Sequence, residues 1–222
     1  ALRPPAGRVI ETRVLHSVGI GESDLAQRLG SLMDRTSVPL VGTTASGGVV
    51  SVRIRYEGEA PRDQAKLTVD QAAGKVLILA GVFVFGEGDE TLASVVLNKL
   101  KQTGQTIAVV ESCTGGMLGE ELTAIPGSSA CVLGGWITYS NEMKQALVGV
   151  PSELFAPGAP GAVSREVARA MARGGRERSG ASIALSITGV AGPDGGTPAK
   201  PVGTVWVSLA HARGSDTRRF SM

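Results

Sequence analysis

The sequence predicts an α/β protein in which a small α+β domain precedes an α/β domain with a mixed, mostly covered sheet. Three observations lead to this expectation. Residues 1–104 combine strand-like and helix-like apolar patterns, residues 105–222 alternate strands with helices, and Gly104 ends the last helix pattern of the first part. The chain therefore divides into predicted domains at 1–104 and 105–222.

In the first domain, each predicted element shows an apolar period or an end residue that suits it. Proline favours the first position of a helix, so Pro61 is expected to begin one. The nearly unbroken apolar run over residues 76–85 predicts a strand that is buried on both faces. In chain order the expected elements are a strand over 9–17, a helix capped by Ser23, a hairpin of 38–45 with 49–56, a helix over 61–73, a strand over 76–85, and a helix from Asp89 to about Gly104.

The second domain begins with the apolar strand pattern at Thr106. Its strands and helices alternate, which predicts a partly parallel sheet covered on both faces. Ser164 is expected to cap a helix that stops near Arg173, because Gly174 and Gly175 weaken a helix. In chain order the expected elements are a strand over 106–110, a helix over 117–123, a strand over 130–138 with a short helix after it, the helix from Ser164, strands over 182–188 and 202–210, and the start of a further strand over 217–220.

Charge and cysteine content narrow the classes of partner. Residues 1–104 carry 12 Lys and Arg against 11 Asp and Glu, and residues 105–222 carry 10 against 9, so nucleic-acid binding is not expected. No apolar stretch approaches the roughly 20 residues that span a bilayer, so no membrane partner is expected. Cys113 and Cys131 lie next to apolar segments and form no spaced framework, which favours a reducing cytoplasm and no zinc site.

The most informative segment joins the predicted strand over 106–110 to the helix over 117–123, and it reads Glu111-Ser112-Cys113-Thr114-Gly115-Gly116. A side chain at such a turn stands at the carboxyl edge of a sheet, beside free N–H groups and the positive end of a helix dipole. A second segment of the same layout, Tyr139-Ser140-Asn141-Glu142-Met143-Lys144, offers a phenol and an amine. Together the two segments form a candidate serine–lysine site for acyl transfer.

Lys144 is informative because it falls in the first turn of its predicted helix. A cation there opposes the helix dipole, and a desolvated position disfavours the charged ammonium further. An amine that is neutral near pH 7 could take a proton from a serine hydroxyl. Each residue also has a plainer interpretation: Ser112 as a helix cap, Cys113 as a small buried apolar side chain, Tyr139 as a packed aromatic, and Lys144 as a solvated surface charge.

A glycine-rich loop lies between the last two long strands and reads Gly189-Val190-Ala191-Gly192-Pro193-Asp194-Gly195-Gly196-Thr197-Pro198. Such loops expose N–H donors with no side chain in the way. They suit a phosphate, or a negative charge that develops in a transition state. The loop also follows the carboxyl end of a predicted strand that finishes at Thr188, where open α/β sheets bind their ligands.

Five segments of the second domain resemble, in order and spacing, the C-terminal domain of the competence/damage-inducible CinA family, a domain also known as nicotinamide-nucleotide amidase. The segments are the turn over 111–116, Tyr139-Ser140-Asn141 with Lys144, Gly161-Ala162-Val163-Ser164, the loop over 188–197, and Pro201-Val202-Gly203-Thr204-Val205. Residues 8–103 look like the middle, KH-like domain of the same family. The resemblance implies that the chain is a fragment without the family's N-terminal, molybdopterin-binding-like domain.

The resemblance implies an amidohydrolase that deamidates nicotinamide mononucleotide to nicotinic acid mononucleotide and ammonia, with no metal and no cofactor. By the same resemblance Ser112 is the nucleophile, Lys144 is the base that activates it, and Tyr139 assists proton transfer. One main-chain segment would hold the oxyanion and another the nucleotide phosphate, in an order that stays open. The substrate-binding residues are Thr114, Gly115 and Gly116 in the turn, and Thr188, Gly189, Gly192, Gly195, Gly196 and Thr197 in the loop. The family forms dimers, so a homodimer is expected.

Two other functions stay open at this point. Cys113 could be the nucleophile, since a thiol at a helix N-terminus has a lowered pKa. The chain could instead be a regulatory module, in which the KH-like unit contacts nucleic acid and the second domain only senses a nucleotide. Against that reading, residues 1–104 have no Gly-X-X-Gly loop at a helix junction. His16 and His211 fall in different domains, which disfavours a zinc or Ser-His-Asp hydrolase.

Overall fold

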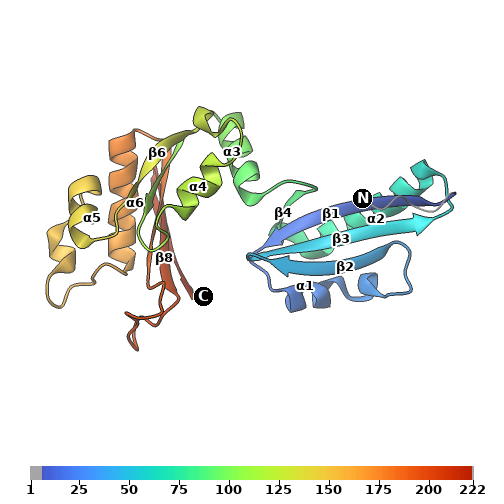
Figure 1. Ribbon diagram of the computed structural model, residues 1–222, viewed down its shortest axis with the longest axis horizontal. Helices are drawn as coiled ribbons and strands as arrows, with labels where there is room; N and C mark the ends of the chain where they lie inside the picture. The colour runs from blue at the N-terminus through green and yellow to red at the C-terminus, as the bar shows by residue number, and fades with distance from the viewer. Residues whose placement is uncertain (1–6, 222) are drawn as a thin grey trace. The chain divides into compact units, whose positions relative to one another are not determined.

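The computed structural model describes residues 7–221, and Figure 1 shows the chain as a ribbon. The chain separates into two compact units, of which the first ends at Val95 and the second begins at Val96. This division falls within helix α3 (Leu92–Gln102). No helix of the described residues is both long enough and apolar enough to cross a membrane.

The first unit is an antiparallel sheet with two helices packed on it. Its strands lie in the order β2-β3-β1-β4, and every neighbouring pair is antiparallel. The elements are β1 (Val9–Val18), α1 (Glu22–Leu29), β2 (Leu40–Ser46), β3 (Val49–Gly58), α2 (Arg62–Ala80) and β4 (Val84–Glu87), with short 3-10 turns η1 (Gly30–Met33) and η2 (Gly81–Phe83).

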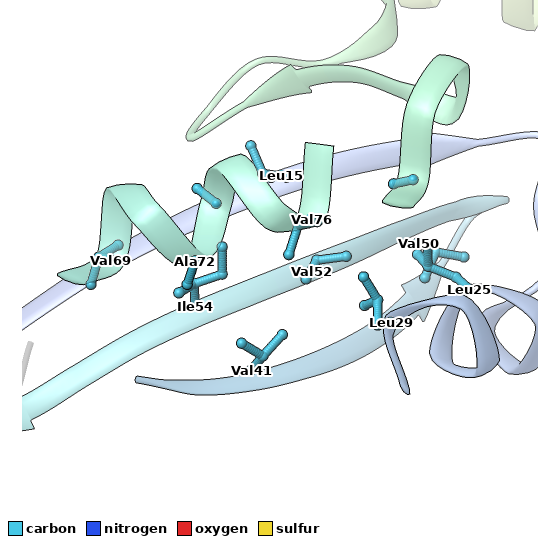
Figure 2. Close-up of a cluster of buried hydrophobic side chains, with 12 residues drawn as sticks. Leu15, Leu25, Leu29, Val41, Val50, Val52, Ile54, Val69, Ala72 and Val76 are labelled. Atoms are coloured by element: carbon cyan, nitrogen blue, oxygen red, sulfur yellow. The ribbon is translucent and has the colours of Figure 1, made fainter. Parts of the chain in front are cut away.

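The core of the first unit forms where one side of α2 meets the sheet, as Figure 2 shows. On β3, Val52 and Ile54 point to the same side because alternate residues of a strand share a face. On α2, Val69 and Val76 share a face because they lie two turns apart. Each such side chain, when fully buried, contributes about 1.5–3 kcal/mol to the free energy of unfolding.

The predicted strand over 76–85 is wrong, because α2 continues to Ala80 and β4 begins only at Val84. Of this apolar run only Val76 and Ala80 are buried, and they lie four residues apart on the inner face of the helix. Ile78, on the outer face, is 83% exposed. A run of apolar residues does not by itself distinguish a buried strand from the end of a helix.

Two predicted helix caps are also wrong. Ser23 lies inside α1, and Gly21 occupies the cap position without any side-chain bond. At the start of α3, Thr91 and Ser94, in place of Asp89, provide the capping side chains, and Ser94 itself lies in the first turn of the helix. The N–H of Ser94 donates to Thr91 Oγ1 over 3.1 Å, and the N–H of Thr91 donates to Ser94 Oγ over 3.0 Å. Such reciprocal bonds satisfy two free donors at the start of a helix.

The second unit is built around one mixed sheet with the strand order β6-β5-β7-β8-β9. The pairs formed by β5 with β6 and β7 are parallel, and the pairs of β8 with β7 and β9 are antiparallel. The predicted fold class is confirmed. The elements are β5 (Ile107–Glu111), α4 (Met117–Thr123), β6 (Val132–Ile137), α5 (Asn141–Val148), α6 (Arg165–Ser179), β7 (Ile183–Gly189), β8 (Thr204–His211) and β9 (Gly214–Ser221), with 3-10 turns η3 (Ser128–Ala130) and η4 (Ser152–Phe155).

Helix α6 packs across this sheet and runs past its predicted stop near Arg173 to end at Ser179. Gly174 lies inside the helix because a side chain would not fit there: a Cβ atom would collide with the carbonyl oxygen of Val148 at the end of α5. The glycine costs the helix about 1 kcal/mol of propensity, but it lets α6 approach α5 closely. This contact holds in place the helix that carries Lys144.

Candidate active site

Ser112 stands at the carboxyl end of β5, in the parallel part of the sheet. The main chain is held from both sides at this point. The N–H of Ser112 donates to the carbonyl of Ile187 on β7 over 3.0 Å, and the N–H of Thr138 after β6 donates to the carbonyl of Glu111 over 2.7 Å. Ser112 is only 7% exposed. Its hydroxyl is therefore fixed at the edge of the sheet where the sequence predicts it.

Helix α5 brings Lys144 to this turn. The hydroxyl of Ser140 caps the helix, and Lys144 follows in its first turn. Lys144 is 1% exposed, and its Nζ lies 3.0 Å from Ser112 Oγ. The same nitrogen lies 2.7 Å from the carbonyl oxygen of Thr138 and 3.0 Å from that of Tyr139. The structure thus brings the predicted serine and lysine into hydrogen-bonding contact.

The surroundings of Lys144 favour a neutral amine. Burial lowers the pKa of Lys144, and the nearby acidic groups of Cys113 and Glu142 offset only part of this effect. A neutral amine has two N–H donors and one lone pair. The two carbonyl oxygens take the two donors, so the lone pair is left for the hydroxyl of Ser112. Lys144 is therefore placed to act as a general base toward Ser112.

The pKa of the Cys113 thiol, next to Ser112, is shifted in the direction that disfavours a nucleophile. Burial raises the pKa of Cys113, and its own main-chain N–H and Lys144 counteract the rise only in part. A Cys113 nucleophile would need a lowered pKa, because the thiolate is the reactive form. The direction of this shift therefore favours Ser112 over Cys113 as the nucleophile. The other cysteine, Cys131, is buried.

Glu111 was not among the predicted site residues, yet its side chain holds the turn in shape. It is 1% exposed and accepts three main-chain N–H groups. Those of Gly116 and Leu118 reach Oε2 over 3.1 Å each, and that of Gly119 reaches Oε1 over 2.8 Å. Gly116 is the N-cap residue of α4, and as a glycine it has no side chain that could accept hydrogen bonds from the free N–H groups at the start of the helix. Because Glu111 precedes Ser112 directly, the same contacts fix the main chain at Ser112.

A cavity of about 290 Å³ opens beside the pair formed by Ser112 and Lys144. Its polar groups come from this pair, from the side chains of Cys113, Tyr139, Thr188 and Asp194, and from the main chain of the glycine-rich loop. The lining residues are Ser112, Cys113, Tyr139, Lys144, Ala162, Val163, Thr188, Gly189, Val190, Ala191, Gly192, Asp194 and Gly195.

The glycine-rich loop presents unused donors to this cavity. Within residues 7–221, the main-chain N–H groups of Gly192, Asp194 and Gly195 bond to no other protein group. Gly192 and Gly195 have φ angles of +84° and +85°, which side chains rarely permit, so the loop requires glycine at both positions. Thr188 lines the cavity as well, but its hydroxyl donates to the carbonyl of Ala162 over 2.9 Å.

The predicted binding residues that do not line the cavity are Thr114, Gly115, Gly116, Gly196 and Thr197. In the turn, two donors are used internally: the N–H of Gly115 donates to the carbonyl of Ser112, and the N–H of Gly116 donates to Glu111. Among the described residues, the N–H of Cys113, which lines the cavity, also donates to no other protein group, so the turn and the loop both have unused donors.

Tyr139 lines the cavity but is 75% exposed. Among the described residues, its hydroxyl has no hydrogen bond to Ser112 or Lys144, and its link to the pair is its main-chain carbonyl. His211 does not line the cavity, and His16 belongs to the first unit. The described part of the chain contains no group of three or more His, Cys, Asp or Glu side chains that could hold a metal ion.

Two family models match the chain: the damage-inducible protein CinA KH domain over residues 12–86, and the CinA C-terminal domain over residues 89–222. A CinA-like protein of Gemmatimonas aurantiaca is 50% identical over 207 residues, which are 93% of this chain and 47% of that protein. A CinA-like protein of a Synechococcus strain is 48% identical over 205 residues, which are 92% of this chain and 48% of that protein. The chain spans about half the length of these curated relatives.

Among solved structures, the competence/damage inducible protein CihA from Agrobacterium tumefaciens is 40% identical to this chain, with a TM-score of 0.55. The match covers 59% of this chain and 78% of that one. The family models, the curated relatives and this structure all bear CinA or competence/damage-inducible names, which is the family that the sequence motifs resemble.

Proposed function

This chain belongs to the CinA family, and on that premise we propose that its second unit is an amidohydrolase that converts nicotinamide mononucleotide to nicotinic acid mononucleotide and ammonia. The observation that carries the proposal is the distance of 3.0 Å between Lys144 Nζ and Ser112 Oγ at the side of a cavity. A serine activated by a neutral lysine is a nucleophile for acyl transfer, and a carboxamide is an acyl donor.

In the first step, Ser112 Oγ attacks the carboxamide carbon while its proton passes to Lys144 Nζ. A bond forms between Oγ and the carbon, and the carbonyl electron pair moves onto the oxygen. The new ammonium keeps its two hydrogen bonds to the carbonyls of Thr138 and Tyr139. Its third N–H is then available to the amide nitrogen of the substrate.

The negative oxygen of the tetrahedral intermediate needs N–H donors that are already in place. In the proposed mechanism these come from the loop over 189–195, because the N–H groups of Gly192, Asp194 and Gly195 are unused and line the cavity. In the turn after Ser112, the N–H groups of Gly115 and Gly116 are bonded internally, which leaves the N–H of Cys113, another residue of the cavity lining, as a further donor.

The intermediate collapses when the bond between carbon and nitrogen breaks. Lys144 gives its proton to the leaving nitrogen, so ammonia departs and an ester of Ser112 remains. A water molecule then loses a proton to Lys144 and attacks the ester carbon. The bond to Oγ breaks, Oγ takes the proton back, and the acid leaves with the site restored.

The cavity also suits a pyridine nucleotide. Val163 and Val190 offer apolar contacts to a flat ring, and Asp194 adds a carboxylate to the same lining. The ring nitrogen of a pyridine nucleotide is positively charged, whereas free nicotinamide is neutral. A carboxylate near the ring therefore favours the nucleotide or the riboside over the free amide.

We expect kcat/KM for ammonia release to be at least about tenfold higher for nicotinamide mononucleotide than for nicotinamide or nicotinamide riboside. Only the nucleotide has a phosphate, and one charge-assisted hydrogen bond to that phosphate is worth a factor of this size. The measurement is ammonia release from these compounds under identical conditions. Equal rates on all three would contradict the nucleotide assignment. No release from any of them would contradict the amidase itself.

Glu111→Gln is expected to lower kcat by about 10- to 100-fold, because a shift of about 1 Å at the nucleophile has an effect of this size. The amide has one oxygen in place of two, so at least one of the three N–H groups that Glu111 now accepts would face an NH2 group. Steady-state kinetics should show the change in kcat with KM little altered, since Glu111 is a positioning residue and does not line the cavity.

Glu120→Gln is the matched control, because Glu120 is an exposed carboxylate on the same helix, α4. The free energy of unfolding should fall by about 1–3 kcal/mol in Glu111→Gln and hardly at all in Glu120→Gln. If both variants kept the same kcat, Glu111 would have no part in positioning Ser112.

A further inference from the structure

Among residues 7–221, the lining of the cavity beside Ser112 contains no cation available to a phosphate. Lys144 is the one basic residue of this described lining, and its amine is buried and bonded to Ser112 and two carbonyls. Asp194 adds a negative charge. A phosphate monoester carries nearly two negative charges at pH 7, so a cationic subsite outside this cavity would bind the phosphate of a nucleotide better than main-chain donors beside Asp194. This reasoning rests on the proposed function, because it takes the substrate to be a nucleotide.

A second cavity, of about 330 Å³, adjoins the first, and Val163 lines both. Its lining carries three cationic side chains, which are Arg165, Lys200 and Arg219, against the single carboxylate of Glu166. Arginine binds phosphate well because its planar guanidinium can donate two parallel hydrogen bonds. The excess of positive charge that the first cavity lacks is therefore present next to it.

The sheet register places Arg219 in line with the nucleophile. Glu111, the last residue of β5, pairs with Ile187 on the parallel strand β7. Ser112 is the next residue after Glu111, so it lies beside Thr188. Thr188 pairs with Trp206 on β8, and Trp206 pairs with Arg219 on β9. Paired residues on neighbouring strands point to the same face of a sheet. With strands about 4.8 Å apart, three steps separate the Cα atoms of Ser112 and Arg219 by about 14 Å.

In a nucleotide, the ring, the ribose and the phosphate follow one another in a row. With the carboxamide at Ser112, the ring lies in the first cavity and the phosphate lies one sugar away from the ring. The paired residues extend from Ser112 across the sheet through Thr188 to Trp206 and Arg219, and the last two line the second cavity. The side chain of Arg219 covers part of the remaining distance.

The geometry points to the second cavity as the subsite that binds the phosphate of the substrate, with Arg219 as its main ligand and Arg165 and Lys200 adding positive charge. One guanidinium nitrogen of Arg219 lies 3.5 Å from Thr204 Oγ1, which leaves its other donors for a ligand. Lys200 Nζ donates to the carbonyl of Pro160, so its charge is held at the cavity.

Arg219→Gln is the direct test. It is expected to raise KM for nicotinamide mononucleotide about tenfold, because a hydrogen bond between charged groups is lost. The ratio of kcat/KM for the nucleotide over that for the riboside should fall by the same factor of about ten, since the riboside has no phosphate. Arg165→Gln should change this ratio in the same direction, and it serves as a second variant if Arg219→Gln does not fold.

Arg218→Gln is the matched control. It removes the same charge from the next residue of β9, but Arg218 pairs with Val207 and lines a different cavity, together with Leu185 and Phe220. Its side chain therefore lies on the opposite face of the sheet. The ratio of the two kcat/KM values should change less than about twofold, as expected for an exposed charge outside the site.

A binding measurement separates this subsite from the amidase reaction. In Ser112→Ala protein, calorimetric titration with nicotinamide mononucleotide should give a Kd about tenfold weaker with Arg219→Gln than with Arg218→Gln. Equal effects of the two arginine variants, or equal losses on nucleotide and riboside, would overturn the subsite. If the unmodified chain released no ammonia from any compound, the proposed function would fail, and the titration alone would decide the subsite.

Discussion

Ser112→Ala abolishes ammonia release from nicotinamide mononucleotide if Ser112 is the nucleophile, with kcat lowered by at least about four orders of magnitude. The reason is that no other group next to Lys144 can form the ester. Ser112 Oγ lies 3.0 Å from Lys144 Nζ, whereas burial raises the pKa of the neighbouring thiol of Cys113 and so disfavours its reactive thiolate. The measurement is kcat by ammonia release, with circular dichroism to establish that the variant is folded.

Cys113→Ala is the control for this result. The thiol is partly buried and forms part of the cavity lining, so its loss should affect packing and change kcat less than about tenfold. Alkylation of the protein with a thiol reagent should inhibit weakly or only by steric block. An inactive Cys113→Ala variant beside an active Ser112→Ala variant would make the protein a thiol enzyme.

Lys144→Met should be as inactive as Ser112→Ala, since methionine fills much of the same space without a basic lone pair. Lys144→Arg should also be inactive, because a guanidinium does not become a neutral base. Both variants leave the carbonyls of Thr138 and Tyr139 without their present donor, which should lower the free energy of unfolding by about 1–3 kcal/mol. Near-normal turnover by Lys144→Arg would mean that Lys144 supplies only positive charge.

The pH dependence gives a second measurement on Lys144. Because the neutral amine is the active form in the proposed mechanism, kcat/KM should rise with pH through the pKa of Lys144, which burial lowers. The folded protein binds fewer protons than the unfolded chain between this lowered pKa and the ordinary pKa of lysine. The free energy of unfolding should therefore rise with pH over that window, and Lys144→Met should lack the rise. A flat profile of kcat/KM across this range would contradict the assignment of the base.

The elements around the site could be predicted from the sequence because their signals are local. The helix over 117–123 has the bounds of α4, and the strand over 106–110 is β5 shifted by one residue. The failures lie where long-range packing overrides such signals. Gly174 has the sequence signal of a helix breaker, but the structure shows that glycine is needed there for the close contact with α5. The apolar run over 76–85 has the sequence signal of a strand, but its burial follows a helical period. The domain limits 1–104 and 105–222 remain a prediction.

The candidate pair could be named from the sequence, but its geometry could not. The residue types and the helix position of Lys144 predict a depressed pKa, whereas the distance to Ser112 depends on how α5 packs against the sheet. Glu111 was missed because an acidic residue at the end of an apolar strand carries no helix-cap signal for a helix that begins after it. A usable signal does exist: the cap position of α4 is Gly116, which has no side chain, so its donors need an acceptor from elsewhere.

Lys144 Nζ, the proposed base, is oriented by two carbonyl oxygens instead of a third side chain. In many nucleophile–base pairs the orienting group is a side chain, and one substitution can remove it. A main-chain carbonyl persists whatever amino acid occupies positions 138 and 139, provided that the path from β6 to α5 is kept. Thr138 is itself buried and its hydroxyl donates to the carbonyl of Glu111, so a substitution there also removes a bond that holds this path. Tyr139 contacts Lys144 only through its main chain, so a substitution at position 139 leaves that contact in place.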